Sequence, residues 1–342
     1  MALAAQRLKS RLAVLLPHLI SPCCGAPFNS GLDGFACAQC RAVYPIDSGL
    51  PCLYWEESGP QRSGEVTRRV REFYEDHPFP DYEDFDDLAS LIDKAKTSVF
   101  ARMLDRQLPF SCKVLECGCG TGQLSNFLGI AHRSVIGTDI SLPSLRLAEE
   151  FREKRRLERV YFLQMNLFAP VFPDESFDFV ICNGVLHHTA DPEGGFQRLA
   201  RLVRPNGFLV VGLYHRYARL ATSFRGAVIR WFGEGAGILD PRLRREKLGG
   251  RRRRAWIADQ YRNPHESRHT VGEVLKWIPR AGLQFVRSIP KVRMLEKFDS
   301  EERLFEPETP STRPERWLKE FSWGLKPDSE GGFFTVIARK PS

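Results

Sequence analysis

Glycines at alternate positions follow an apolar segment that ends in an acid. The segment reads Val114-Leu-Glu-Cys-Gly-Cys-Gly-Thr-Gly122, so Gly118, Gly120 and Gly122 come shortly after Glu116. Glycines let the backbone approach a ligand closely because no Cβ stands in the way, and the Glu116 carboxylate can meet a positive group on that ligand. Dinucleotide-binding loops instead have the spacing G-x-G-x-x-G, which sets a helix N-terminus against a pyrophosphate. The spacing G-x-G-x-G favours a nucleoside ligand without a pyrophosphate.

A second candidate ligand-binding residue is Asp139, which ends the apolar segment Val135-Ile-Gly-Thr-Asp. It lies 17 residues after Gly122, at the expected tip of the next strand. A carboxylate in this place can accept hydrogen bonds from both hydroxyls of a ribose. An Asp at a strand end can also cap the following helix, which here would begin near Ser141. With the glycine-rich loop one strand away, we predict ribose binding.

Side chains able to accept a proton follow the next two expected strands. His187 and His188 come after the fourth, and Tyr214 and His215 come after the fifth. Each could act as a general base if the substrate must lose a proton. Each could equally pack against the rim of the site or cap it, and the sequence leaves both interpretations open.

All these residues are expected at one edge of a parallel sheet. From residue 111 onward, apolar segments alternate with helical ones, which indicates βαβ units with right-handed crossovers. Ligands of such sheets bind at the carboxyl ends of the strands, where the strand order reverses. The expected strands are Lys113 to Cys117, Val135 to Asp139, Val160 to Met165, Phe177 to Cys182 and Phe208 to Leu213, with helices from near Thr121, over Leu142 to Arg156 and over Gly195 to Val203.

We predict a doubly wound, mostly parallel α/β sheet of seven strands, preceded by a small ribbon-like domain. Five strands are expected to be parallel, and the last two come from the C-terminal region, over Leu283 to Ile289 and Phe333 to Ala338. Three units are expected: an N-terminal helix and ribbon-like domain at 1–60, a helical and aromatic linker at 61–108, and the sheet domain at 109–342. The sheet domain has inserts at 216–280 and 291–331, which should lie over the strand ends.

The motifs resemble those of class I S-adenosylmethionine-dependent methyltransferases, closest to the type 11 subfamily, from about residue 110 to residue 215. Phe177-Asp-Phe-Val-Ile-Cys-Asn-Gly-Val-Leu-His-His-Thr is similar to the family's fourth-strand motif, and Leu199-Ala-Arg-Leu-Val-Arg-Pro-Asn-Gly-Phe-Leu-Val-Val to its helix, turn and fifth strand. The resemblance implies a Rossmann-like sheet and S-adenosylmethionine as the methyl donor. It implies these contacts: the three glycines under the methionine moiety, Glu116 near its amino group, Asp139 on the ribose, Ile140 and Asn166 beside the adenine, and Asn183 and Gly184 beside the sulfonium.

One position departs from the family pattern. The family usually has an acid where this chain has Asn166, although an amide can still accept a hydrogen bond from the adenine amino group.

An aromatic, proline-containing segment, Phe73-Tyr74 and His77-Pro-Phe-Pro80, precedes the sheet domain. Aromatic faces suit a sulfonium cation, so the segment is either a lid over the cofactor or a packed connection.

Three cysteines in the N-terminal segment resemble ligands of the zinc-ribbon domain that accompanies some methyltransferases. They are Cys24, Cys37 and Cys40. Zinc takes four ligands, which paired C-x-x-C motifs supply. The second motif, Cys37-Ala-Gln-Cys40, is intact, but Ser21 stands where the first would begin, which leaves Cys23 and Cys24 adjacent.

The fourth zinc ligand is not evident from the spacing. His18 or Cys52 could complete the site, although neither is at the distance of a C-x-x-C motif. Bound zinc and a metal-free remnant of a ribbon therefore both remain open.

The chain has nine cysteines, an odd number, and several lie in expected core strands. This usage fits reduced thiols in the cytoplasm better than a disulfide framework.

The positive charge is concentrated in one segment. The chain has 50 Lys+Arg against 42 Asp+Glu, a net +8, and the run Arg242–Arg254 holds eight basic residues and one acid. This run could bind phosphates of RNA, an anionic lipid or an acidic metabolite, or it could be a solvated loop. Only Trp256 and Tyr261 are aromatic nearby, which argues against a base-stacking surface.

The function predicted first is S-adenosylmethionine-dependent methylation of a small or lipid-like acceptor, because long inserts follow the fifth strand and no basic face is spread over the chain. An rRNA or tRNA methyltransferase is the alternative, and a cofactor-binding scaffold or regulator without catalysis is a further one.

No apolar run approaches the roughly 20 residues that cross a bilayer. The acid-poor N-terminus, whose first acid is Asp33, could be a targeting segment or a short amphipathic helix.

Overall fold

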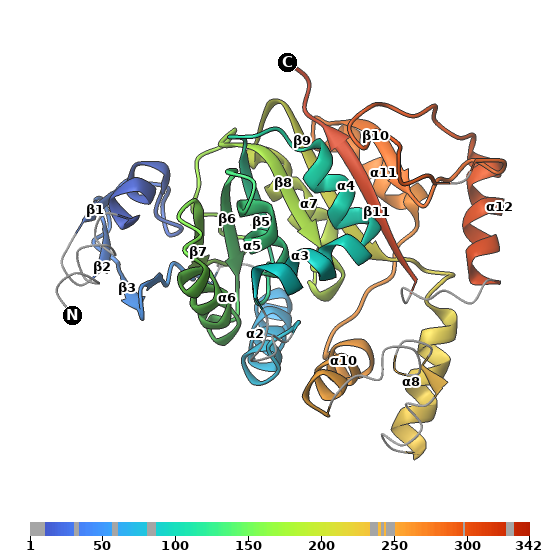
Figure 1. Ribbon diagram of the computed structural model, residues 1–342, viewed down its shortest axis with the longest axis horizontal. Coiled ribbons are helices and arrows are strands. Elements are labelled where there is room, and N and C mark those ends of the chain that lie inside the picture. The colour runs from blue at the N-terminus through green and yellow to red at the C-terminus, as the bar shows by residue number, and fades with distance from the viewer. Residues whose placement is uncertain are drawn as a thin grey trace.

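The computed structural model describes residues 11–30, 34–56, 61–80, 87–232, 239–240, 243, 250–296, 298–325 and 332–342. Within them lie a small four-stranded sheet near the N-terminus and a seven-stranded sheet with helices on both faces (Figure 1). Residues 1–10 of the expected N-terminal helix lie outside the described ranges, and residues 11–15 are helical.

The large sheet confirms the predicted doubly wound architecture. Its strand order is β10-β11-β9-β8-β5-β6-β7, and β5 to β9 are parallel to one another, whereas β11 is antiparallel to both of its neighbours. The chain order reverses between β5 and β8, so the site is expected at their carboxyl ends. The strands are β5 Lys113–Cys117, β6 Ser134–Asp139, β7 Val160–Gln164, β8 Phe177–Asn183, β9 Val203–Tyr214, β10 Gln284–Ile289 and β11 Phe333–Arg339.

Alternate residues of each strand pack into two hydrophobic cores, one on each face of the sheet. On β5, for example, Val114 enters one core and Leu115 the other, as the two-residue period of a strand requires. One core is closed by α3 Leu88–Thr97, α4 Val99–Gln107, α5 Gln123–Gly129 and α6 Leu142–Arg155, and the other by α7 Pro192–Leu202, α11 Val271–Arg280 and the N-terminal sheet.

The N-terminal ribbon docks beside β7. Its strands are antiparallel, and Phe28, Phe35 and Tyr44 form edge-to-face pairs that join the second core. The segment after the ribbon continues onto the sheet domain, where Leu53 N–H donates to the Gln164 carbonyl at 3.0 Å. The ribbon consists of η1 Leu16–His18, β1 Phe28–Ser30, β2 Gly34–Cys37, β3 Val43–Asp47 and β4 Leu50–Pro51.

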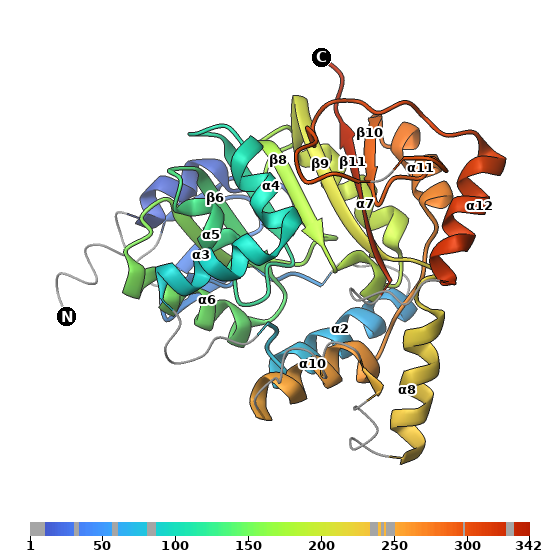
Figure 2. The same cartoon turned by 45° about the vertical axis from the view of Figure 1, so that its right-hand side comes forward.

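Three helices surround the carboxyl ends of the parallel strands. They are α2 Gln61–Asp76, α8 Leu220–Phe232 and α10 Gly250–Arg262, and Figure 2 shows α2 and α10 side by side below the sheet. Of the first insert, α8 and α10 therefore lie at this edge, as expected, whereas α11 covers a face of the sheet. Of the arginine run, Arg242, Arg244, Arg245 and Lys247 lie outside the described residues.

The second insert, 291–331, differs from its expected position. Phe305 packs on Phe179 and Phe208, on the face covered by α4, and α12 Arg313–Gly324 lies along α11. Glu320 and Trp323 of α12 reach the end of β9, where both contact His215. The sequence analysis missed α12, although a local signal marks its start: Thr312 accepts from the Glu315 N–H as N-cap, with proline in the first turn.

Among the described helices, none combines the length and apolar composition needed to cross a membrane.

Candidate functional site

The glycine-rich loop connects β5 to α5 in a conformation that other residues adopt poorly. Gly118, Gly120 and Gly122 have φ of 76°, 54° and 72°, in the left-handed region that glycine enters without strain. A Cβ at Gly118 would lie 2.2 Å from a Val185 methyl group, and one at Gly120 only 2.1 Å from the Phe79 carbonyl oxygen. The glycines are therefore required by conformation and by the segments packed on the loop.

Asp139, at the tip of β6, fixes this loop. Its Oδ2 accepts from the Gly120 N–H at 2.8 Å, and its Oδ1 accepts from the Ser141 N–H at 2.8 Å. The N-cap of α6 is Ser141, whose hydroxyl accepts from Ser144 N–H, so Asp139 is not that helix's cap. Each Asp139 oxygen retains a further lone pair that can accept a hydroxyl proton.

Glu116 lies buried beneath the same loop. Its Oε2 accepts a short hydrogen bond from the Ser125 hydroxyl of α5. Burial raises the pKa of Glu116 to about 8, against the opposite effect of the Ser125 bond. The side chain is thus mostly protonated at pH 7, and an approaching cation would ionise it.

The aromatic segment after α2 rests directly on the loop. The Thr121 N–H donates to the Phe79 carbonyl at 3.3 Å, and the Thr121 hydroxyl donates to the Pro80 carbonyl. The Tyr74 carbonyl accepts from the Ser141 hydroxyl at 2.9 Å. These contacts place the segment over the loop and beside the tip of β6.

A buried polar cluster joins this segment to α10. The Tyr74 hydroxyl donates to Asp259 Oδ1 at 2.8 Å and accepts from Asn263 Nδ2 at 2.9 Å. Gln260 Nε2 contacts the Tyr214 hydroxyl at 2.7 Å and Asp259 Oδ2 at 2.9 Å. The sequence alone did not point to Asp259, Gln260 or Asn263, because their partners lie far away along the chain.

The cluster continues to an arginine. The Arg219 guanidinium lies 3.6 Å above the Tyr214 ring and pairs with Glu266 at 2.7 Å. It also donates to Gln260 Oε1 at 2.6 Å. Arg219, Asp259 and Gln260 are buried yet hydrogen-bonded, so the cluster forms a fixed polar wall at the ends of β8 and β9.

Of the four candidate bases, His188 is best suited to accept a proton. Its Nδ1 lies 2.7 Å from the His265 carbonyl and so carries the proton, which leaves Nε2 to accept one. Burial lowers the pKa of His188 and keeps the ring neutral. Its ring also makes an edge contact with Tyr74, at 6.2 Å between centroids.

Two of the other candidates, His187 and Tyr214, are less suited to that role. His187 is fully buried, its ring is stacked on Tyr214 at 3.9 Å, and its Nδ1 accepts from Tyr214 N–H at 3.3 Å. Burial lowers the pKa of His187 well below its usual value. Burial raises the pKa of Tyr214, so its phenol stays protonated. Tyr214 can therefore donate a hydrogen bond but not act as a base at neutral pH.

His215 has a structural environment instead. Its Nε2 lies 3.0 Å from Glu320 Oε2, and the same carboxylate accepts from the backbone N–H groups of Val271 and Gly272, each at 3.1 Å. His215 therefore links the end of β9 to the start of α11 and to α12.

The residues expected near the adenine and sulfonium lie at the same sheet edge. Asn183 is exposed at the end of β8, and Ile140 is half-buried just after β6. The Asn166 amide is already engaged, since Nδ2 donates to the Trp55 carbonyl at 3.0 Å and Oδ1 accepts from Phe168 N–H at 3.1 Å. Asn166 thus ties the segment after the ribbon to the end of β7.

The ribbon brings four thiols together, one more than predicted. The ligand atoms of Cys23, Cys24, Cys37 and Cys40 all lie within 4.8 Å of one another. Cys23 Sγ is 3.0 Å from Cys40 Sγ, and Cys24 Sγ is 3.3 Å from Cys37 Sγ. The fourth thiol is therefore Cys23, and neither His18 nor Cys52 belongs to this group. Spacing alone could not reveal it, because the turn after Ser21 bends both adjacent cysteines toward the intact motif.

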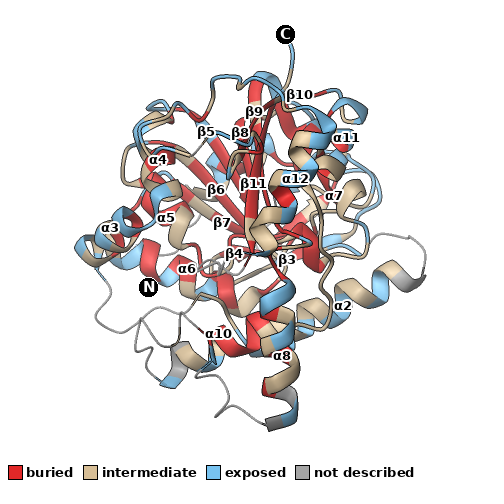
Figure 3. Ribbon diagram, turned by 90° about the vertical axis from the view of Figure 1, so that its right-hand side faces the viewer, coloured by how far each residue is buried: buried red, intermediate tan, exposed pale blue. Residues whose placement is uncertain are grey.

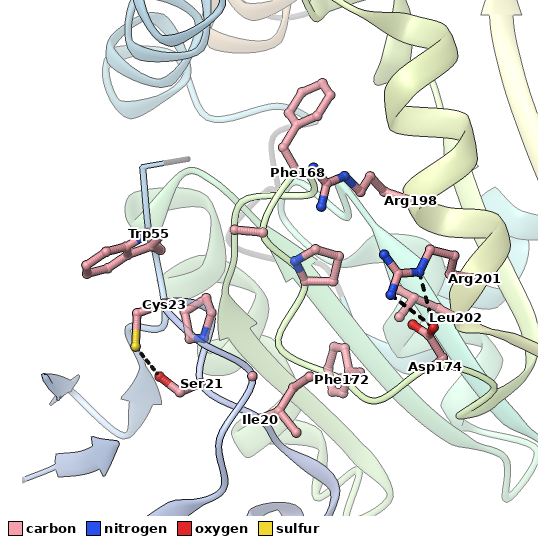
Figure 4. Close-up of a pocket in the computed structure, with 14 residues that line it drawn as sticks. Ile20, Ser21, Cys23, Trp55, Phe168, Phe172, Asp174, Arg198, Arg201 and Leu202 are labelled. Atoms are coloured by element: carbon pink, nitrogen blue, oxygen red, sulfur yellow. Dashed lines mark hydrogen bonds and ion pairs between the residues drawn. The ribbon is translucent and has the colours of Figure 1, made fainter. Parts of the chain in front are cut away.

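A cavity of 370 Å³ lies between the ribbon and the segment after β7. Figure 4 shows Trp55 on one side and Arg198 and Arg201 on the other, with Arg201 paired to Asp174 at 3.0 Å. No residue of the glycine-rich loop or of the β6 tip lines it. This cavity is thus separate from the candidate cofactor site.

Residues 115–211 match the family model described as a methyltransferase domain. The match covers this segment, which is less than a third of the chain. It spans the glycine-rich loop, the tip of β6 and most of β9, so the matched residues include Asp139 and both histidines after β8.

Two relatives illustrate the similarity. An uncharacterized protein of Synechococcus sp. is 27% identical over 198 residues, which cover 51% of this chain and 48% of the relative. The ubiquinone biosynthesis O-methyltransferase of Bradyrhizobium diazoefficiens is 32% identical over 126 residues, 36% of this chain and 49% of that enzyme. The chain spans about half the length of these curated relatives.

A solved structure shares the fold. The structure of PKMT2 from Rickettsia typhi aligns with a TM-score of 0.50 at 14% identity, covering 75% of this chain and 54% of that chain. At this identity the likeness concerns the fold alone. The matched segment 115–211 forms part of the seven-stranded sheet described above.

Proposed function

We propose that this protein is an S-adenosylmethionine-dependent methyltransferase that acts on a small or lipid-like acceptor. The observation that carries the proposal is Asp139, which holds the glycine-rich loop by Gly120 N–H and keeps lone pairs for a ribose. S-adenosylmethionine supplies an electrophilic methyl group with its own leaving group. The protein must mainly align donor and acceptor and exclude water.

The chain's own groups fit this cofactor. The positive-φ glycines give the loop its tight turn beside Asp139, and Glu116 is a buried carboxyl that an ammonium group would ionise. The segment with Phe79 would act as a lid, since it rests on Gly120. On the acceptor side, Tyr74 and His188 lie together between the lid and the end of β8.

His188 is the general base in this proposal where the acceptor must lose a proton. Its Nδ1–H is held by the His265 carbonyl, which orients Nε2 as the accepting nitrogen. Tyr74 and Tyr214 keep their protons because burial raises both pKa values. Their rings would position the acceptor, and their hydroxyl groups are held in place by the polar cluster of Asp259 and Gln260.

Methyl transfer to defined acceptor classes tests the proposal. The full chain is incubated with S-adenosylmethionine labelled in the methyl group and with either a lipid extract or purified rRNA and tRNA. Label in the organic phase is expected. Label in RNA would favour the alternative function. The described residues give that function little support: the Trp256 indole N–H and the Tyr261 hydroxyl both donate to Asp240, and Trp256 is buried. Cofactor binding without transfer to any acceptor would favour a scaffold.

Glu116 gives the binding step a pH dependence. Its carboxyl, with a pKa of about 8, is protonated in the free protein at pH 7, and the cofactor's ammonium group is expected to ionise it. Binding therefore releases close to one proton at pH 7, and affinity rises with pH between 6 and 7, by up to about tenfold per pH unit. Calorimetry in two buffers of different ionisation enthalpy measures the proton release.

Glu116→Gln is the matched variant, since it keeps the size of the side chain and the bond to Ser125. It should bind more weakly and release no proton. The same proton release in this variant would contradict the role assigned to Glu116.

We further propose that the ribbon binds one Zn²⁺ through Cys23, Cys24, Cys37 and Cys40. Four thiols within 4.8 Å of one another suit tetrahedral zinc. The Cys40 N–H points at Cys37 Sγ, 3.5 Å away, and lowers the pKa of Cys37 to about 5, which favours the thiolate that binds metal. Zinc would stabilise a ribbon too small to hold its strands by packing alone.

Zinc content tests this assignment. The purified full chain is expected to contain about one zinc per molecule by mass spectrometry, and Cys23→Ser and Cys37→Ser are each expected to lose most of it. Cys52→Ser is the control and should keep its zinc. Full zinc in Cys23→Ser would show that the fourth ligand is misassigned, and metal-free wild type grown with zinc would contradict the site.

A further inference from the structure

An exposed apolar stripe runs along α8. Leu220, Phe224 and Trp231 are 57%, 71% and 86% exposed. Their spacing of four and then seven residues places them on one side of a helix. Figure 2 shows that α8 extends away from the body of the molecule, so no other described element covers this stripe.

A second stripe lies on α12 and joins the first. Tyr217, just before α8, contacts Phe321 of α12 at 5.9 Å between ring centroids. Figure 3 shows α12 and α8 on the same side of the molecule, one above the other. The exposed apolar residues of this second stripe and of the loop beside it are Met294, Leu295, Trp317, Leu318, Phe321 and Leu325.

We propose that this surface, the α8–α12 face, docks on an anionic lipid bilayer. Monomeric proteins rarely expose an apolar patch of this extent without a binding role. An amphipathic helix with aromatic and aliphatic residues on one side and cations beside them binds in the headgroup region of membranes. The α8–α12 face has this composition.

The charges near the face complement anionic headgroups. The α8 sequence contains arginines and no acid, and α10, which packs against α8, has four consecutive arginines directly after its first residue. Arg254 of α10 is exposed. Basic residues beside a membrane surface attract anionic lipid headgroups. Tyr261 of α10 lies against Gly226, on the side of α8 away from the apolar stripe. The arginines of α10, which end the basic run Arg242–Arg254, therefore belong to the helix that supports α8 from behind.

A lipid surface explains the face better than two other occupants. Nucleic acid is bound by stacked rings and cations, whereas much of this face is aliphatic, with Leu220, Leu295 and Leu325 among its most exposed residues. A symmetric contact between two copies would bring the cations of α8 and α10 toward one another, without acids on α8 to offset them.

The α8–α12 face also adjoins the acceptor side of the site. Arg219, directly before α8, contacts the ring of Tyr214, and α10 holds Tyr74 of the lid segment through Asp259. If the proposed function holds, on which this step rests, a lipid-like acceptor would reach the site from the docked bilayer.

Vesicle co-sedimentation of the full chain tests the docking. Wild type should bind vesicles of phosphatidylcholine with about a third phosphatidylglycerol, bind pure phosphatidylcholine much less, and lose binding at high salt. The double variant Phe224→Ser, Trp231→Ser should bind the anionic vesicles at least about tenfold more weakly. Phe110→Ser is the matched control, because Phe110 is 74% exposed but precedes β5, and it should bind like wild type.

Several outcomes would overturn the docking. One is equal binding of the double variant and wild type to anionic vesicles, and another is no binding of wild type to those vesicles. A third is a dimer of wild type, seen by light scattering and absent in the double variant, when neither protein binds vesicles. Cofactor titration separates the two proposals. Normal S-adenosylmethionine binding without vesicle binding refutes only the docking, and vesicle binding without cofactor binding refutes only the proposed function.

Discussion

Replacing Asp139 by alanine is expected to weaken S-adenosylmethionine binding by at least about tenfold, which is about 1.4 kcal/mol or more. The variant loses both acceptors for the ribose hydroxyls, and hydrogen bonds to a charged group contribute about 1.5–3 kcal/mol. It also releases Gly120 N–H and Ser141 N–H, which the two carboxylate oxygens now hold at 2.8 Å. The loop would then be less ordered before the cofactor arrives.

Titration calorimetry of wild type and Asp139→Ala measures this effect. Asp93→Ala is the control, because Asp93 on α3 is exposed and forms a surface pair with Lys96. It should bind the cofactor like wild type. Unchanged affinity in a folded Asp139→Ala variant would show that the ribose is bound elsewhere.

Gly120→Ala is expected to have the larger effect on binding, a loss of at least about a hundredfold in affinity. The new Cβ would lie 2.1 Å from the Phe79 carbonyl oxygen, and Gly120 has a φ of 54°. An L-residue in the left-handed region costs about 1–2 kcal/mol, and the clash can be relieved only by moving the backbone of the loop or of the lid segment. Either movement changes the surface that the cofactor must fit.

Gly282→Ala separates strain from the clash. Gly282 follows α11 with φ of 71°, but a Cβ added there would have no neighbouring atom within 4 Å. This variant should lose about 1 kcal/mol of stability in urea unfolding and keep normal cofactor affinity. Near-normal affinity in folded Gly120→Ala would mean that the lid segment does not rest on the loop in solution.

The sheet and the position of the glycine-rich loop beside Asp139 could be predicted because their signals are local. A buried parallel strand reads as a short apolar run, and the loop after β5 needs glycines wherever φ is positive. Asp139 follows from its place at a strand tip, one strand away from the loop. Each of these signals lies within a few neighbouring residues.

The acceptor side could not be predicted in the same way. Tyr74 meets Asp259 across 185 positions of the chain, and Asp259 reads in the sequence as one polar residue of an arginine-rich helix. Only the packing of α2 beside α10 makes the pair. The two histidines after β8 were predicted together, yet only the contact of His188 with the His265 carbonyl distinguishes their proton states.

Calorimetric titration of the wild-type chain with S-adenosylmethionine and, separately, with NAD tests the central claim most directly. The loop spacing, the Asp139 geometry and the matched methyltransferase domain predict binding of S-adenosylmethionine with a Kd in the micromolar range, about 8 kcal/mol, and no binding of NAD. Absence of S-adenosylmethionine binding, or tighter binding of NAD, would contradict the assignment of this site.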